Sequence, residues 1–309
     1  MEQLEVKEQV AIASATANNA PALATATAKP AASVLPAQGC PTCGTAPATN
    51  GTTAPSYVYA IGRIEPRFPR PSVEKEFAQA TGRADTAGLT DRQAANKVLS
   101  QRPNRYLARH LCWVLTIEGL ETYILVPRDP ADLDLLVEAL RPTPTPLDLD
   151  CVIGIRGPIA PAEMCNGLMV PILLFDQIYS FDRDSLIKAI PKPEKVAAEQ
   201  FTATAGEVFD RIMQMADNAG ATDEQRALNY LVMRYPAIYS TATECHGRNS
   251  SLTAVDVQPS TLSGTRKLVE VIFSFTNRNT DVVEQYFVRV DVTEEFPFLV
   301  TKMSPYYNR

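Results

Sequence analysis

Long apolar segments and histidine are scarce in this chain of 309 residues. The longest apolar run extends from Leu168 to Phe175 and is interrupted by Pro171. A helix needs about 20 consecutive apolar residues to cross a bilayer, so this run is far too short to be a transmembrane helix. Histidine occurs only twice, as His110 and His246.

An excess of basic charge and an export signal are also lacking. The chain carries 29 Lys and Arg against 35 Asp and Glu, so no basic stripe is available to displace counterions from nucleic-acid phosphates. At the N-terminus, Glu2, Glu5 and Glu8 stand where a signal peptide would carry Lys or Arg before an apolar stretch. We therefore expect a cytoplasmic protein that binds neither nucleic acid nor a membrane. In that compartment its six cysteines favour free thiols or metal ligands over disulfides.

The chain is long enough for two domains, and its hydrophobic fraction of 45% is ordinary for a globular protein. Residues 1–55 differ, because Ala, Thr and Pro dominate them and large apolar side chains are almost missing. Such a segment cannot bury enough apolar area to offset its ordering entropy, so we predict a disordered tail over residues 1–39. The motif Cys40-Pro-Thr-Cys43-Gly44 follows and begins a first domain over residues 40–192.

The first domain alternates between strand-like and helical patterns. Thr90-Asp-Arg-Gln93 is a capping box that should begin a helix, and Glu118-Gly119 should join two strands in a hairpin. Apolar runs predict strands at 56–64, 112–115, 122–126, 150–156 and 168–174, with helices at 73–80, 91–100, 130–140 and 182–190. Mixed elements with hairpins favour an α+β domain over a wound parallel sheet.

A smaller second domain is predicted over residues 193–309, beyond Pro191-Lys-Pro193. Thr204-x-x-Glu207 and Thr222-x-x-Gln225 are capping boxes that should begin two helices, with Pro236 ending or kinking the second. From Ser251 the apolar period changes to two and predicts four strands joined by polar turns. Two helices should thus cover one face of a four-stranded antiparallel meander, again an α+β arrangement.

Several segments resemble a known family. They are Tyr57–Pro69 (YVYAIGRIEPRFP), Ser72–Arg83 (SVEKEFAQATGR), Phe287–Lys302 (FVRVDVTEEFPFLVTK) and Ser304–Tyr307 (SPYY). Together they resemble the C-terminal region of PatG-type cyanobactin maturation proteases, which act in pathways that make ribosomal, macrocyclised peptides. The resemblance extends from about Cys40 to the C-terminus. In the family this region is a domain of unknown function.

The same resemblance limits the activity to be expected. In the family the catalytic work belongs to a subtilisin-like macrocyclase domain that precedes this region. Neither His110 nor His246 lies in a segment typical of a subtilisin triad, and the sequence has no Gly-Thr-Ser nucleophile motif. The resemblance therefore implies a free-standing, non-catalytic accessory or scaffold protein of cyanobactin-type maturation. Its partners would be precursor peptide, a maturation enzyme or, through an exposed sheet face, a second copy of itself.

The cysteines suggest a structural zinc site. Two thiols two residues apart, with Pro inside the turn and Gly after it, are typical of half a tetrahedral site. Cys151 and Cys165 flank a loop rich in Pro and Gly and would complete it with Cys40 and Cys43. In the alternative interpretation, Cys151 is an inert buried thiol and the Cys40–Cys43 pair binds nothing. An open zinc position would favour a zinc- or thiol-dependent enzyme that acts on the modified peptide.

The remaining cysteines carry weaker hypotheses. Cys112, next to Trp113, fits a core strand, although His110 and Cys112 could together supply metal ligands. Cys245 and His246 are adjacent in sequence, whereas a catalytic Cys–His pair is normally assembled from distant segments. We interpret them as a helix end, where histidine can help to cap carbonyls.

A charged turn is the candidate partner-binding surface. It contains Arg63, Glu65, Arg67, Phe68 and Arg70 among several prolines. Arginine forks can meet carboxylates of a peptide or protein, so the turn could form a binding lip. The alternative is an ordinary solvated loop.

Overall fold

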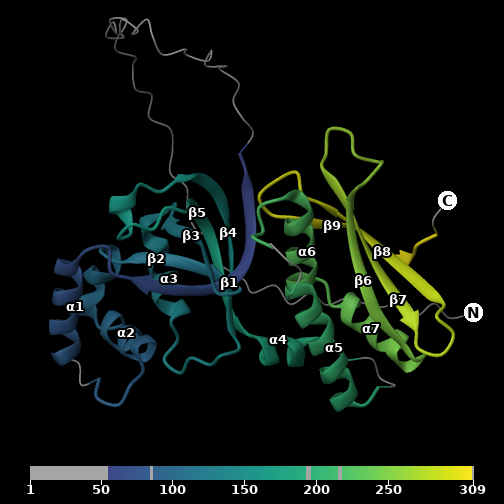
Figure 1. Ribbon diagram of the computed structural model, residues 1–309, viewed down its shortest axis with the longest axis horizontal. Coiled ribbons are helices and arrows are strands. Elements are labelled where there is room, and N and C mark those ends of the chain that lie inside the picture. The colour runs from purple at the N-terminus through teal and green to yellow at the C-terminus, as the bar shows by residue number, and fades with distance from the viewer. Residues whose placement is uncertain (1–54, 84–85, 193–195, 215–217, 308–309) are drawn as a thin grey trace, which may run out of the picture. The chain divides into compact units, whose positions relative to one another are not determined.

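The structure is a computed structural model and describes residues 55–83, 86–192, 196–214 and 218–307. The predicted tail over residues 1–39 and the motif with Cys40 and Cys43 lie outside the described residues. Within these ranges no helix is long and apolar enough to cross a membrane. The described chain contains a closed barrel followed by helices and a second sheet, so the α+β prediction is confirmed (Figure 1).

The barrel contains five strands in the order β1-β2-β3-β5-β4. Its strands are β1 (Tyr57–Arg67), β2 (Cys112–Ile117), β3 (Leu120–Pro127), β4 (Asp148–Ile159) and β5 (Pro171–Asp182). The predicted hairpin is confirmed between β2 and β3, where Glu118 and Gly119 both have positive φ, as a two-residue turn requires. The β3–β5 pair is parallel, and the other neighbouring strands pair antiparallel.

Closure of the barrel depends on β1, which changes its partner halfway along. Residues from Tyr57 to Gly62 pair with β4, and residues from Arg63 to Arg67 pair with β2. A Cβ on Gly62 would overlap the Thr116 carbonyl oxygen, so glycine permits the close approach at the change of partner. The buried Asp150 carboxylate on β4 accepts the Ile64 N–H at 2.9 Å just beyond that point.

Helices after β1 cover one end of the barrel core. They are α1 (Pro71–Arg83), α2 (Asp91–Leu99) and η1 (Arg102–Arg109), and α3 (Leu133–Ala139) follows β3. The capping box at Thr90 is confirmed, since its side chain accepts from Gln93 N and the Gln93 side chain accepts from Thr90 N. Buried Val98, Leu107 and Trp113 join these helices to the strands in one hydrophobic core.

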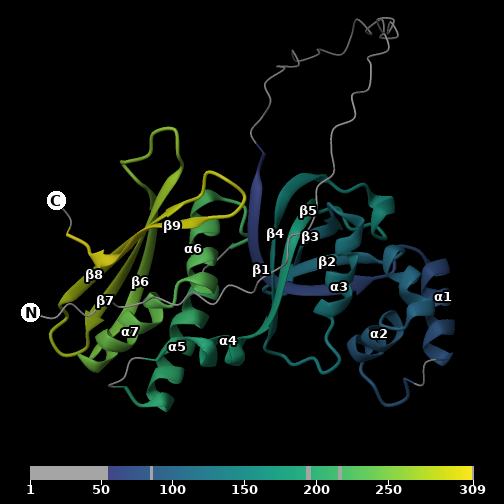
Figure 2. The same ribbon diagram turned by 180° about the vertical axis from the view of Figure 1, so that it is seen from behind.

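The C-terminal portion is a meander covered by helices. Its strands β6 (Ser250–Pro259), β7 (Leu268–Asn277), β8 (Val283–Asp291) and β9 (Phe298–Pro305) pair in chain order, which confirms the predicted four-stranded meander. The helices are α4 (Arg183–Ala189), α5 (Ala198–Met213), α6 (Asp223–Arg234) and α7 (Ala237–Gly247). Side chains of α5, α6 and α7 share a core with β7 and β8. Figure 2 shows these helices beside the β6–β9 sheet.

The prediction of two helices before the meander is wrong, because α5, α6 and α7 all precede it. Thr204 is buried inside α5, so its apparent capping box is not a helix start. The box at Thr222 is confirmed, and Pro236 ends α6 as expected. Because proline lacks an N–H and suits a first helical turn, the chain begins α7 directly after it.

Strand β1 is also tied to the C-terminal portion. Tyr59 N donates to the Gly220 carbonyl at 2.9 Å, and Asn229 Nδ2 on α6 donates to the Tyr59 carbonyl at 2.8 Å. Gly220 has a φ of +68°, and a Cβ there would overlap the Tyr59 carbonyl oxygen. The half of β1 near Tyr59 is thus hydrogen-bonded both to α6 and to the segment before it.

Candidate functional site

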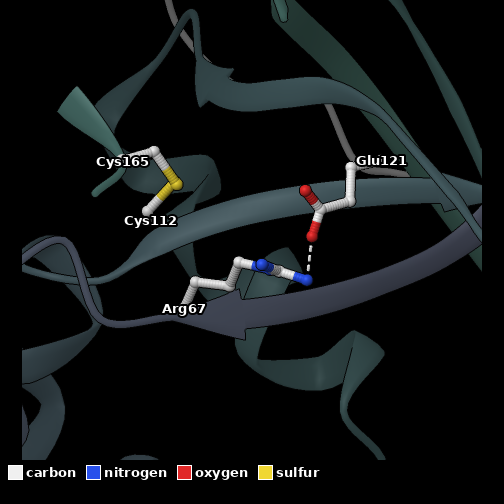
Figure 3. Close-up of a disulfide and its surroundings, with 4 residues drawn as sticks. All are labelled: Arg67, Cys112, Glu121 and Cys165. Carbon is white, nitrogen blue, oxygen red and sulfur yellow. Dashed lines mark ion pairs between the residues drawn. A yellow bond between two sulfur atoms is a disulfide. The ribbon is translucent and has the colours of Figure 1, made fainter. Parts of the chain in front are cut away.

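The structure separates the cysteines that the sequence analysis had grouped. Cys165 forms a disulfide with Cys112, which joins the start of β2 to the loop between β4 and β5 (Figure 3). This pairing differs from our expectation of free thiols or metal ligands, because the two cysteines are 53 positions apart in the sequence and only the barrel brings them together. The interpretation of Cys112 as a core residue is confirmed, since its side chain is buried.

Cys151 lies in a different part of the core. Its thiol is fully buried with Tyr59, Ile61 and Ile153, and burial raises its pKa to about 12. The structure therefore does not bring Cys151 and Cys165 together as the zinc hypothesis required. Among the residues that the structure describes, no group of three or more His, Cys, Asp or Glu side chains could hold a metal ion. Cys40 and Cys43 lie outside the described residues.

The two histidines lie in unrelated places. His110 is exposed at the end of η1, where it makes an edge contact with the Tyr106 ring. His246 is half-buried in the last turn of α7, which agrees with the interpretation as a helix end. The neighbouring Cys245 thiol is buried and accepts a hydrogen bond from Arg248 Nη2 at 3.3 Å. Burial raises the pKa of this thiol, which opposes a role as a nucleophile.

The predicted partner-binding residues lie together at the end of β1. We call the segment from Arg63 to Arg70 the β1 lip. Arg67 and Arg70 are exposed, while Arg63, Glu65 and Phe68 are half-buried. Residues between Arg63 and Phe68 border three cavities, while Arg70 is not among their lining residues. One of these cavities shares Glu65 with another and Pro66 with the third, so this part of the lip is a wall common to adjoining grooves.

The α1–α2 groove is the largest of the three, with a cavity volume of about 750 Å³. Its apolar lining includes Phe68, Phe77 and Leu111, and the two phenylalanine rings lie 5.3 Å apart between centroids. The other lining residues are Glu65, Pro66, Glu74, Ala78, Thr81, Asp91, Arg92, Ala94 and Ala95. The size is typical of ligand-binding clefts, which occupy roughly 300–1,000 Å³.

The disulfide groove adjoins it and shares Pro66, Phe68 and Glu74. Its volume is about 570 Å³, and Cys165 with the residues that follow it forms one wall. Arg67 on β1 forms an ion pair with Glu121 on β3 at this groove (Figure 3). Because the disulfide fixes the loop that carries Cys165, it also fixes the shape of this wall.

The hairpin groove is also bordered by the lip, through Arg63 and Glu65. It has a volume of about 440 Å³ and is lined by Arg63, the β2–β3 turn, and residues of α5 such as Phe209 and Asp210. Arg63 Nη2 donates to the Pro146 carbonyl at 2.6 Å, and Arg183 forms an ion pair with Asp210. The basic groups of this groove are therefore already bonded to the protein.

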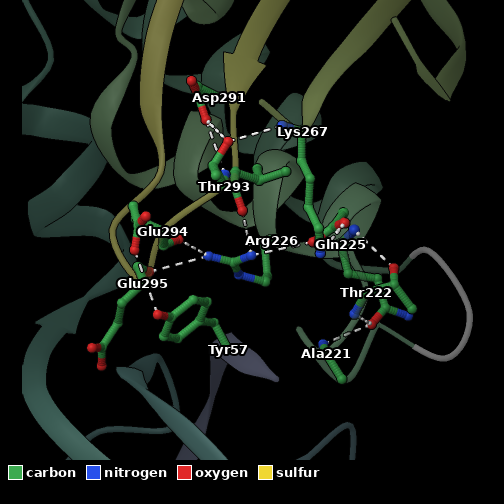
Figure 4. Close-up of polar contacts among 12 residues, drawn as sticks. Tyr57, Ala221, Thr222, Gln225, Arg226, Lys267, Asp291, Thr293, Glu294 and Glu295 are labelled. Carbon is green, nitrogen blue, oxygen red and sulfur yellow. Dashed lines mark hydrogen bonds and ion pairs between the residues drawn. The ribbon is translucent and has the colours of Figure 1, made fainter. Parts of the chain in front are cut away.

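Figure 4 shows a charged cluster around Arg226 that the sequence did not predict. Arg226 on α6 is almost fully buried and donates to the carbonyls of Val292, Glu294 and Glu295, between β8 and β9. Its guanidinium also lies over the Tyr57 ring, 5.3 Å from the centroid. Nothing in the sequence marked Arg226, because arginine on a helix is usually exposed.

Glu295 has an unusual protonation equilibrium in this cluster. Burial, together with a hydrogen bond to Asp176 and the charge of that carboxyl, raises its pKa to about 7. Arg128 Nη1 lies 2.7 Å from Asp176 Oδ2 and 3.5 Å from Glu295 Oε2, which partly offsets the effect. Glu295 Oε1 is buried and has no hydrogen-bond partner among the described residues.

The described chain is an α+β protein, in which a closed barrel is followed by an antiparallel meander that helices cover. Residues 195–306 match the family model described as PatG C-terminal, so this portion of the chain is similar to that family. The fold is similar to a solved structure titled "PatG Domain of Unknown Function", with a TM-score of 0.66 and 19% sequence identity. That match covers 82% of this chain and 99% of the solved chain. Among the curated proteins compared, none matches.

Proposed function

We propose that this protein is a non-catalytic accessory protein of cyanobactin-type peptide maturation, which binds precursor peptide or a maturation enzyme at the β1 lip. The observation that carries the proposal is the position of the lip on three adjoining grooves. The match to the PatG C-terminal model supports the pathway.

The residue types of the lip suit recognition. Aromatic residues and arginine are enriched at protein interfaces and carry much of their binding energy. Phe68 is half-buried, so its ring offers an apolar surface that is already held against Phe77. Arg70 is exposed and could pair with a carboxylate of the partner. Preorganised side chains of this kind bind with a smaller loss of conformational entropy.

Binding of the full chain to purified cyanobactin precursor peptide and maturation enzymes tests the proposal. Arg70→Glu reverses an exposed charge of the lip and should weaken binding of the true partner about tenfold, equivalent to about 1.4 kcal/mol. Arg278→Glu is the matched control, because Arg278 is exposed in the turn between β7 and β8. The control should bind like the unaltered chain.

Two binding results would contradict the proposal. Either no pathway component binds the full chain, or Arg70→Glu and Arg278→Glu leave its binding equal. A homodimer is a further partner that we propose from the sequence, and sedimentation of the full chain measures it directly. Formation of the mature peptide at an unchanged rate without this protein would also oppose an accessory role.

A further inference from the structure

The α1–α2 groove has an apolar floor that the fold leaves partly open. Phe68 lies directly after the end of β1, and Phe77 lies on α1. Leu111 and Ala95 also line the groove and are buried. An apolar side chain placed here would contact two aromatic rings and lose most of its contact with water. The floor therefore favours a ligand with at least one large apolar group.

The rim of the same groove is acidic. Glu65 on β1, Glu74 in the first turn of α1 and Asp91 in the first turn of α2 approach from different elements. In the described part of the chain, none of these carboxylates forms a salt bridge, although Glu65 interacts electrostatically with Arg92. The rim can therefore accept positively charged groups from a ligand.

Among the described residues that line the groove, Arg92 is the one basic residue, and three of its nitrogens already donate hydrogen bonds within the fold. Nε donates to the Leu140 carbonyl, Nη1 to Ile64 and Nη2 to Ala139, at 3.2, 2.8 and 2.8 Å. These bonds tie α2 to β1 and to the end of α3. With three acidic groups against one arginine, the lining keeps a net negative charge.

We propose that the α1–α2 groove binds a peptide segment in which an apolar side chain is flanked by lysine or arginine. This inference rests on the proposed function and names the chemistry of the partner. The apolar side chain occupies the floor between Phe68 and Phe77, and the basic side chains reach Glu74 and Asp91. An acidic segment is repelled by the same rim, so the groove selects by charge as well as by shape.

The test uses the full chain and a fluorescein-labelled peptide of alternating Lys and Leu, compared by fluorescence anisotropy with the matching Glu and Leu peptide. The Lys peptide should bind at least tenfold more tightly. The double variant Glu74→Gln/Asp91→Asn should weaken it about tenfold, because it removes two surface charge pairs. Phe77→Ala, which removes part of the floor, should weaken it to a similar extent. Glu138→Gln, an exposed position on α3, is the matched control and should change nothing.

Equal affinity for the Lys and Glu peptides would overturn the inference. An equal loss of affinity for the Lys peptide in Glu74→Gln/Asp91→Asn and in Glu138→Gln would also overturn it. A dimer of the full chain that Phe77→Ala dissociates would mean that a second copy occupies the groove, which also overturns it. Pathway components measured in parallel separate the two proposals. Binding of a pathway component that Glu74→Gln/Asp91→Asn leaves intact contradicts the groove assignment alone. Binding of the Lys peptide, with no pathway component bound, contradicts the proposed function alone.

Discussion

Replacing the buried arginine of α6 should destabilise the fold strongly. Arg226 is 2% exposed and its guanidinium donates to three backbone carbonyls between β8 and β9. It also lies 3.2 Å from Asp223 Oδ1 and over the Tyr57 ring (Figure 4). One side chain thus joins α6, the β8–β9 connection and the start of β1.

The magnitude follows from the groups that remain after Arg226→Met. Methionine keeps the apolar stem, so little packing is lost. The carbonyls stay in place without their charged donor, and each unsatisfied buried polar group costs about 1–3 kcal/mol. Water can reach part of the site, because Asp223 is partly exposed. We therefore expect a loss of about 3–5 kcal/mol, as when one partner of a buried charged contact is removed.

Urea denaturation of Arg226→Met beside the unaltered chain measures this loss. Lys267→Met is the matched control, because Lys267 pairs with the same Asp223 at 3.2 Å from a side chain that is 58% exposed. Exposed pairs contribute about 0–1 kcal/mol, so the control should change the free energy of unfolding little. A loss below about 1 kcal/mol for Arg226→Met, or equal losses for both variants, would refute the argument from burial.

Two further perturbations test other contacts. The raised pKa of Glu295 means that the folded state holds a proton which the unfolded state releases, so stability should fall as pH rises from about 4.5 to about 7. Glu295→Gln should reduce that slope in urea denaturation at constant salt, and an identical slope in both proteins would contradict it. Reduction of the Cys112–Cys165 disulfide should cost about 4 kcal/mol, from a loop closed over 53 residues. A Cys112→Ser/Cys165→Ser variant whose unfolding still responds to dithiothreitol would show that the effect arises elsewhere.

Local patterns allowed much of the fold to be predicted. The capping boxes at Thr90 and Thr222 are confirmed because each is completed by a side chain only three residues away. The meander followed from apolar residues at every second position, which share one face of the sheet and pack against the helices. The prediction of a helix start at Thr204 was wrong, because the residue types of a capping box also occur inside a helix.

Features that depend on distant contacts could not be predicted. Nothing in the sequence near Gly62 indicates that β1 changes partner there and closes a barrel. The disulfide was missed for the same reason, since barrel closure brings Cys165 to the start of β2. The β1 lip was predicted from its Arg, Pro and Phe content, but the acidic rim at Glu74 and Asp91 required the packing of α1 against α2.

The central claim is that the β1 lip is the surface on which a partner binds. Hydrogen–deuterium exchange of the full chain, with and without a pathway component that co-purifies with it, tests the claim most directly. We expect slower exchange on binding at residues 63–70 and in α1, beside the α1–α2 groove. Protection confined to β6–β9, with unchanged exchange at the lip, would contradict the account.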